Sequence, residues 1–330
     1  MLQHVWFAKM VDHFGNPLLE QRKLLAGEAF VERVDEVVIR VSGPDNKTWL
    51  HSLLTQDILN LGAGESTEAL LLTPQGHIEH QLKIYLDEND VLLITQLAKA
   101  EELINWLQKM IFRSKVLIER TDLKIFGVFG DYLGKVWKDP FSKANPFSIS
   151  YNSNRSKFDY VEIIAHSSPE LVPAGTMAYD ALRIAAGRPE VTDIDDKSLP
   201  HEFDWLSSAV HLSKGCYRGQ ESVAKIHNLG HPPRRLIVLN LEDGGDLSSR
   251  GNQVLYTDKP VGKVVAAALH FELGSLALAL VARNTPYLDL QVETSGRRVT
   301  ASQQVLVPAD AGKAANLPRP SAFKLSGKRG

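Results

Sequence analysis

One segment of eight residues carries the side chains best suited to chemistry, Lys214-Gly215-Cys216-Tyr217-Arg218-Gly219-Gln220-Glu221. Cys216 is the only cysteine of the chain, and a cation stands two positions away on each side. In an extended segment side chains alternate, so Lys214, Cys216 and Arg218 share one face. Fixed positive charge favours a thiolate over a thiol. The segment indicates either a reactive or contacting thiol or, alternatively, a small buried side chain between two ordinary surface cations.

A second pair of cations, Arg234 and Arg235, directly follows Pro232-Pro233. Two guanidinium groups on a rigid turn suit a carboxylate or a phosphate, and the alternative is a solvated pair at a domain junction. If the fold brings them together, a cationic region can form from this pair and Lys214, Arg218, Arg183 and Arg188.

Composition limits the classes of function. The 330 residues include 37 basic and 39 acidic side chains, and a net charge of -2 gives no global field for nucleic acid or membranes. We therefore expect no stable nucleic-acid binding and no membrane association. A single cysteine excludes a disulfide within the chain and favours a reducing compartment, the cytoplasm. It also excludes an iron–sulfur cluster held by this chain alone, because such clusters use about four cysteine ligands.

Other motifs that could bind metals or nucleotides are incomplete. His201-Glu202 lacks the second histidine of a zinc-protease helix, and no glycine-rich phosphate loop opens a helix after a strand. On a strand, His77 and Glu79 share a face while His80 points away from it. We expect no metal site.

The order of the predicted elements favours an α+β fold. Strands are predicted at 37–41, 69–73, 78–86, 91–94, 116–118 and 125–129, with helices after Pro44 and around 103–111. Strands in hairpins with helices between them are typical of an α+β layer and not of a doubly wound parallel sheet. A further helix is predicted at 177–186, closed by Gly187. After Pro232-Pro233, short strands separated by turns predict a small β-barrel.

The predicted organisation has four parts. We expect an N-terminal extension at 1–34, an α+β region of two halves at 35–231, a β-barrel at 232–307 and a disordered tail at 308–330. Asn, Ser and Pro predict a linker between the two halves near 138–157.

The eight-residue segment resembles the K-G-C-[aromatic]-x-G-Q-E motif of the YgfZ family of folate-binding proteins, which is related to the aminomethyltransferase (T-protein) of glycine cleavage. The similarity extends over roughly residues 35–285 and includes Val41-Ser42-Gly43-Pro44-Asp45, Thr55-Gln56-Asp57, Thr73-Pro74-Gln75-Gly76, Leu182-Arg183-Ile184-Ala185-Ala186-Gly187-Arg188-Pro189 and Leu276-Ala277-Leu278-Ala279. It implies two ferredoxin-like halves followed by a small C-terminal β-barrel, arranged as a ring around a tetrahydrofolate site.

The resemblance also implies a function and a set of site residues. Proteins of this family support the assembly or maintenance of iron–sulfur enzymes, including those that modify tRNA, so folate and iron–sulfur proteins or their assembly factors are the implied partners. Cys216 and Lys214 are the implied reactive or contact residues. Tetrahydrofolate or a one-carbon derivative is the implied ligand of Arg183, Tyr217, Arg218, Gln220 and Glu221, and its glutamate tail that of Arg234 and Arg235.

Three departures from the T-protein leave alternatives open. The T-protein has no counterpart of Cys216, and Glu102 stands where it has a catalytic aspartate, one methylene shorter. The family's carboxylate for the pterin ring is replaced by Ala185, for which Glu190 or Glu202 could substitute. A tetrahydrofolate-dependent aminomethyl or methyl transferase, and a scaffold that has lost folate, therefore remain as alternatives.

Overall fold

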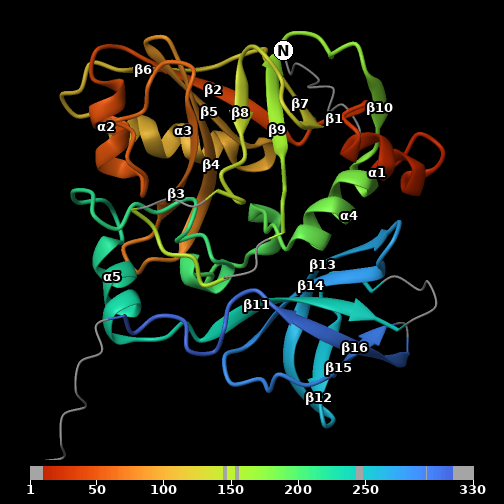
Figure 1. The fold of residues 1–330 in the computed structure, drawn as a ribbon. Helices are drawn as coiled ribbons and strands as arrows, with labels where there is room; N and C mark the ends of the chain where they lie inside the picture. The colour runs from red at the N-terminus through yellow and green to blue at the C-terminus, as the bar shows by residue number, and fades with distance from the viewer. Residues whose placement is uncertain (1–9, 144–146, 153–155, 243–247, 295, 315–330) are drawn as a thin grey trace, which may run out of the picture.

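Two five-stranded sheets and a closed barrel form the protein (Figure 1). The computed structural model describes residues 10–143, 147–152, 156–242, 248–294 and 296–314. The sheets lie side by side above the barrel, as expected for two α+β halves followed by a barrel.

The first sheet has the strand order β10-β1-β7-β9-β8. Its strands are β1 (Ala29–Glu32), β7 (Lys124–Phe129), β8 (Val136–Lys138), β9 (Tyr160–Ala165) and β10 (Val172–Ala174), and its helices are α1 (Pro17–Leu25) and α4 (Thr176–Ala186). The Asn16 side chain accepts from the backbone N–H groups of Leu18 and Leu19 and so caps α1. Because β1 pairs with both β7 and β10, residues 29–32, which lie within the expected N-terminal extension, form a strand of this sheet.

The second sheet has the order β3-β4-β5-β2-β6, and all its neighbouring strands are antiparallel. Its strands are β2 (Glu36–Ser42), β3 (Ser66–Leu72), β4 (Ile78–Asp87), β5 (Asp90–Gln96) and β6 (Leu117–Arg120), and its helices are α2 (Asn46–Leu53) and α3 (Ala100–Lys109). Leu103 and Leu107 are four residues apart, so both face the sheet and pack with Trp49 and Leu50.

The barrel closes in the order β11-β14-β13-β12-β15-β16. Its strands are β11 (Arg234–Leu241), β12 (Gln253–Tyr256), β13 (Lys259–His270), β14 (Gly274–Ala282), β15 (Leu290–Thr294) and β16 (Arg297–Val305). Successive side chains of strand β11 point alternately into two hydrophobic cores. Ile237 and Leu239 fill the barrel, whereas Leu236 and Val238 pack against the body, the part of the protein formed by the two sheets and their helices. The sequence interpretation did not include β16.

Buried ion pairs join the two sheets. The guanidinium of Arg188, which follows α4, binds Glu68 of β3 at 2.6 Å and Asp139, just after β8, at 2.9 Å. Lys83 of β4 likewise binds Glu162 of β9. All these side chains are buried, so each charge depends on its partner from the other segment.

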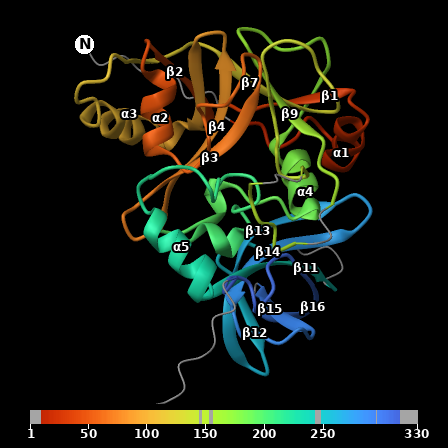
Figure 2. The same ribbon diagram turned by 60° about the vertical axis from the view of Figure 1, so that its left-hand side comes forward.

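The remaining segments complete the junction between the body and the barrel. They are η1 (Leu97–Lys99), η2 (Val191–Asp193), η3 (Pro200–Phe203) and α5 (Gln220–Leu229), a helix that the sequence interpretation missed. Helix α4 packs against both α1 and the barrel strands β13 and β14 (Figure 2). Within 138–157, the described residues after Lys138 contain no helix or strand, but the segment joins β8 and β9 of the first sheet and does not link the two halves.

The C-terminal end of the described chain is ordered against α5. Ala311 is buried, and the N–H of Ala314 donates to the carbonyl of His227, so residues 308–314 pack on α5 instead of belonging to a disordered tail. The rest of that tail lies outside the described residues. Among the described residues, no helix is long and apolar enough to span a membrane.

Candidate functional site

The segment 214–221 is a series of turns that leads into α5, so its side chains do not alternate on one extended face. The Lys214 ammonium donates to the carbonyls of His51 and Leu54, at 2.5 Å each, and to that of Gln56 at 3.2 Å. These carbonyls belong to the last turn of α2 and the residues after it, where a cation is favourable. Burial lowers the pKa of Lys214 to about 8.

Arg218 is held by side chains of β4 and α3. Its guanidinium pairs with Glu79 at 2.6 Å and lies over the Trp106 ring of α3. Glu102 is exposed and stands one turn before Trp106, on the same face of α3. It lines none of the cavities described below.

The thiol of Cys216 is exposed, so the interpretation of a buried core thiol is wrong. Both flanking cations have partners of their own, and the expectation that they share a face with the thiol is also wrong. The two tethers instead anchor the segment on α2 and on the β4–α3 side. What the local geometry offers is an exposed thiol on a firmly attached turn.

Glycine at position 219 lets the segment pack against the turn at Thr73–Gly76. Gly219 has φ +84°, and a Cβ there would stand 2.5 Å from the carbonyl oxygen of Thr73. A Cβ on Gly76 would stand 2.9 Å from that of Ser222 in α5. Three of the sequence motifs named above, 55–57, 73–76 and 214–221, therefore meet at one place.

Tyr217 and the start of α5 lie at the inner side of this junction. Tyr217 is buried in the hydrophobic cluster that also contains Ala181 and Ile184 of α4. The Gln220 side chain donates to the carbonyl of Lys214 at 3.3 Å, and Glu221 is exposed. Of these predicted ligand residues, only Tyr217 packs towards α4.

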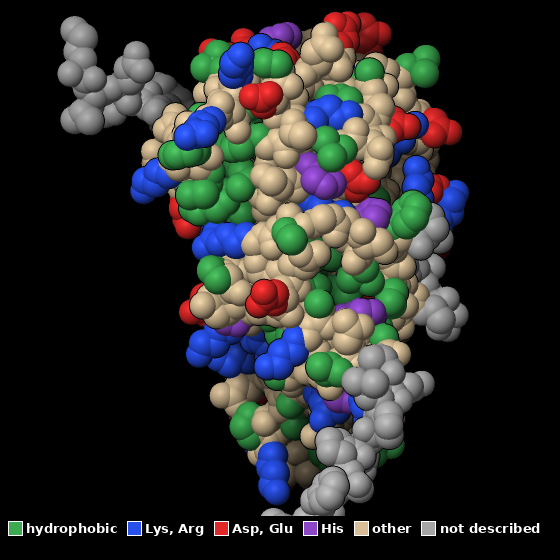
Figure 3. Space-filling view, turned by 90° about the vertical axis from the view of Figure 1, so that its left-hand side faces the viewer, with side chains coloured by type: hydrophobic (Ala, Val, Ile, Leu, Met, Phe, Trp, Pro, Cys, Tyr) green, Lys and Arg blue, Asp and Glu red, His purple; other side chains and the backbone are tan. Residues whose placement is uncertain are grey.

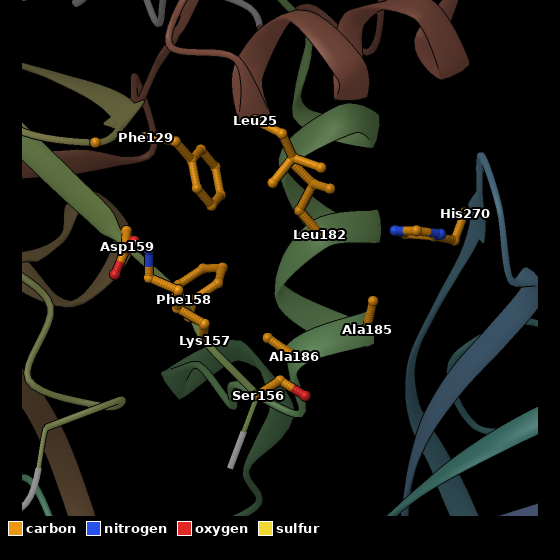
Figure 4. Close-up of a pocket in the computed structure, with 11 residues that line it drawn as sticks. Leu25, Phe129, Ser156, Lys157, Phe158, Asp159, Leu182, Ala185, Ala186 and His270 are labelled. Carbon is orange, nitrogen blue, oxygen red and sulfur yellow. Dashed lines mark ion pairs between the residues drawn. The ribbon is translucent and has the colours of Figure 1, made fainter.

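A cavity of about 370 Å³ lies along α4 (Figure 4). Leu182 and Ala186 face the rings of Phe129 and Phe158, which meet edge to face at 5.4 Å. Ala185 lies on the side of the helix that faces His270, at the end of β13. Leu25, Gly130, Ser156, Lys157 and Asp159 complete the lining. The aromatic and aliphatic walls suit a flat ring.

Polar groups stand on two sides of this cavity. Asp159 is half-exposed and pairs with Lys157, and it lies on the far side of Phe158 from α4 (Figure 4). Across α4, Nδ1 of His270 accepts from the backbone N–H groups of Glu272 and Leu273, at 3.2 Å each. Its Nε2 therefore carries the proton. Burial lowers the pKa of His270, which keeps the ring neutral at pH 7.

Neither glutamate considered as a substitute at Ala185 lines this cavity. Glu190 accepts from Arg33 at 3.0 Å and from the Tyr179 hydroxyl at 2.6 Å, and these partners hold its pKa well below the usual range. Glu202 accepts from Arg234 at 2.8 Å. Asp159, which directly precedes β9, lines the cavity but was not among the carboxylates predicted from the sequence.

The expected cationic region does not form. Arg183 pairs with Asp193 at 2.8 Å, and Arg188 joins the two sheets. Arg234 pairs with Asp195 and Glu202, whereas the buried Arg235 donates to the Thr285 carbonyl and lies over Tyr287. On the face that carries α2 and α5, basic, acidic and apolar side chains are interspersed over the upper half (Figure 3).

A second cavity of about 400 Å³ adjoins the first and shares Gly130, Lys157, Phe158 and Asp159 with it. Lys138 and Lys143 line its outer part. Among the described residues, no group of three or more His, Cys, Asp or Glu side chains is arranged to hold a metal ion.

Several aminomethyltransferases are similar to this chain in sequence. The chain matches no family model. It is 28% identical to an aminomethyltransferase of Rippkaea orientalis over 76% of this chain and 78% of that one, and 26% identical to one of Prochlorococcus marinus over 79% and 81%. It is also 24% identical to the Arabidopsis thaliana protein "Putative transferase At1g60990, chloroplastic", over 81% of this chain but only 66% of that one.

The fold has a solved counterpart. The crystal structure of glycine cleavage system aminomethyltransferase T from Bartonella henselae superimposes with a TM-score of 0.72, at 18% identity, over 90% of this chain and 91% of that one. The predicted α+β fold with a C-terminal barrel is therefore confirmed. The chain is aminomethyltransferase-like in fold and in its relatives.

Proposed function

We propose that this chain is a reduced-folate-binding protein of the YgfZ type, and that the cavity along α4 takes the pterin ring of tetrahydrofolate or a one-carbon derivative. The observation that carries the proposal is the cavity itself. It has aromatic walls, it lies on the helix that bears the motif around Ala185, and Asp159 and His270 are among its lining residues. A pterin ring presents both N–H donors and a carbonyl acceptor, so this lining fits it.

Asp159 is the proposed acceptor for the N–H edge of the ring. A buried donor edge without an acceptor costs about 1–3 kcal/mol, so this position decides affinity. Asp159 lines the cavity and is half-exposed, and its partner Lys157 is itself largely exposed and free to turn away. The short side chain of Ala185 then leaves room and need not supply the acceptor.

Calorimetry with tetrahydrofolate under anaerobic reducing conditions tests this assignment. We expect micromolar binding by the native chain and about tenfold weaker binding by Asp159→Asn, which keeps the shape and removes the charge. Asp122→Asn, an exposed carboxylate outside the cavity, is the matched control. Adding Ala185→Glu to Asp159→Asn should restore affinity. Equal binding by Asp159→Asn and Asp122→Asn would remove Asp159 from the site.

The glutamate tail of folate is assigned to the adjoining cavity. Arg234 and Arg235 were the sequence candidates, but one is neutralised by two carboxylates and the other is buried in the barrel. Lys138 and Lys143 are exposed and line the adjoining cavity. A preference for polyglutamylated folate should fall in Lys138→Ala and Lys143→Ala and persist in Arg234→Ala. The opposite pattern would return the tail to Arg234.

Support of iron–sulfur enzymes, including those that modify tRNA, is the proposed cellular role. The exposed thiol on an anchored turn supports a contact with a partner protein or its cluster. A strain with Cys216→Ala should lose the activity of iron–sulfur enzymes while the purified variant still binds tetrahydrofolate. Full activity of those enzymes in that strain would exclude a role for the thiol.

Aminomethyl transfer is the second candidate, favoured by the names of the relatives. Glu102 is exposed and does not line the cavity along α4, which counts against its acting on a ligand held there. Turnover of an aminomethyl or methyl donor by the purified chain, abolished in Glu102→Gln, would establish the transferase. A scaffold without folate remains the outcome if tetrahydrofolate does not bind and a partner protein does.

A further inference from the structure

A separate cavity of about 430 Å³ lies where the barrel meets the segment that contains η2. Its lining is formed by Asp193, Ile194, Asp195, Arg234, Arg250, Gly251, Gly262, Lys263, Val264, Val265 and Leu280. It shares no lining residue with the two cavities near α4. Neither the proposed pterin site nor the proposed tail site uses it.

Two of the cations that line this cavity have no carboxylate partner among the described residues. Its two carboxylates are already paired, Asp193 with Arg183 at 2.8 Å and Asp195 with Arg234 at 2.5 Å. The Arg234 pair holds the pKa of Asp195 at about 2, so that carboxylate stays ionised and bound to its partner. Arg250 and Lys263 are therefore the two cations of this lining that have no carboxylate partner among the described residues.

Neither remaining cation meets a carboxylate among the described residues. The Arg250 guanidinium donates to the carbonyls of Thr192, Ile194 and Val265, which fix its position without neutralising its charge. Lys263 is exposed and makes no ion pair within the described part of the chain. Two uncompensated cations beside one concavity raise the local concentration of anions.

The rest of the lining indicates a small organic molecule. Ile194 and Val265, both partly buried, provide apolar surface for a carbon skeleton. A cavity of about 380 Å³ continues from this one and shares Asp193, Arg250 and Val265 with it, so Arg250 stands between two spaces. A ligand that spans them would place anionic groups on either side of Arg250.

We propose that this groove between η2 and the barrel is a second ligand site, which binds a small organic anion carrying two or more carboxylate or phosphate groups. Lys263 and Arg250 contact the anionic groups, and the apolar surface takes the carbon skeleton. Carboxylates and phosphates share the recognition chemistry of planar guanidinium and ammonium donors, so both classes are tested.

The test is a titration of the full chain with citrate and, separately, with pyrophosphate at constant ionic strength, followed by the amide NMR signals of Gly251, Val264 and Val265. Saturating shifts at these amides with one probe support the site and identify its class. Lys263→Glu should weaken that binding at least tenfold, because attraction becomes repulsion. Lys259→Glu, an exposed lysine of the same strand outside the cavity, is the matched control and should weaken binding less than twofold.

Two results would overturn the proposal. One is no saturable shift with either probe up to about 10 mM, a level beyond ordinary metabolite affinities. The other is equal weakening by Lys263→Glu and Lys259→Glu, which would reduce the effect to net charge. Tetrahydrofolate binding is measured on the same preparations. Because the groove shares no residue with the cavity along α4, loss of one binding activity without the other separates the two proposals.

Discussion

Gly219 packs segment 214–221 closely against the turn at Thr73–Gly76. Gly219→Ala would suffer twice, from φ +84° and from a Cβ that stands 2.5 Å from the Thr73 oxygen. We expect the free energy of unfolding, measured by urea denaturation, to fall by about 2–4 kcal/mol. Gly64→Ala is the matched control, because its φ of +79° is similar and nothing lies within 4 Å of its Cβ. It should cost only about 1 kcal/mol. Equal losses of unfolding free energy in the two variants would mean that the contact with Thr73 does not contribute to stability.

At the scale of elements, the contact between η3 and α5 makes stability depend on pH. His201 of η3 is fully buried, and burial, with the charge of His227 of α5, lowers its pKa to about 3. Its pKa in the unfolded chain is about 6.5. Between these values the unfolded chain binds the proton and the native one does not, so stability is full above about pH 6.5 and falls as pH falls.

The slope of this loss is measurable by denaturation at several pH values. His201 should remove about 2 kcal/mol between pH 6.5 and pH 5, and His80, whose pKa burial lowers to about 4, adds to the same trend. His201→Asn should flatten the profile, whereas His166→Asn, an exposed histidine, should leave it unchanged. An unchanged profile in His201→Asn would show that His201 takes up its proton in the folded state.

At the scale of the whole molecule, Arg188 ties the two sheets together. Arg188→Met would leave the buried carboxylates of Glu68 and Asp139 without their cation, and we expect a loss of about 3–5 kcal/mol at pH 8. The loss should shrink at pH 5, because protonation relieves the uncompensated carboxyls; the pKa of Asp139 is already raised by burial to about 6. Arg298→Met, which breaks an exposed pair with Asp258, should cost less than about 1 kcal/mol. Similar losses in both variants would contradict a structural role for the bridge.

Much of this architecture could be predicted from local patterns. Alternation in 78–86, helical spacing at Leu103 and Leu107, and Gly187 after α4 each specify one element, and the structure contains all three. Short-range patterns could not reveal that α1 and β1 complete a sheet whose other strands lie about a hundred residues further along. The partners of Lys214, Arg218 and Arg234 come from distant segments too, so their neutralisation by carbonyls and carboxylates was not visible in the sequence.

The central claim is that reduced folate binds along α4, and methyl NMR of the full chain tests it most directly. Tetrahydrofolate, added anaerobically, should cause saturating shifts in the methyl signals of Leu25, Leu182, Ala185 and Ala186, which line the cavity. The methyls of Ile194 and Val265, which line the groove beside the barrel, should stay unchanged. Absence of any shift along α4 at millimolar ligand, or shifts confined to another part of the protein, would contradict the account.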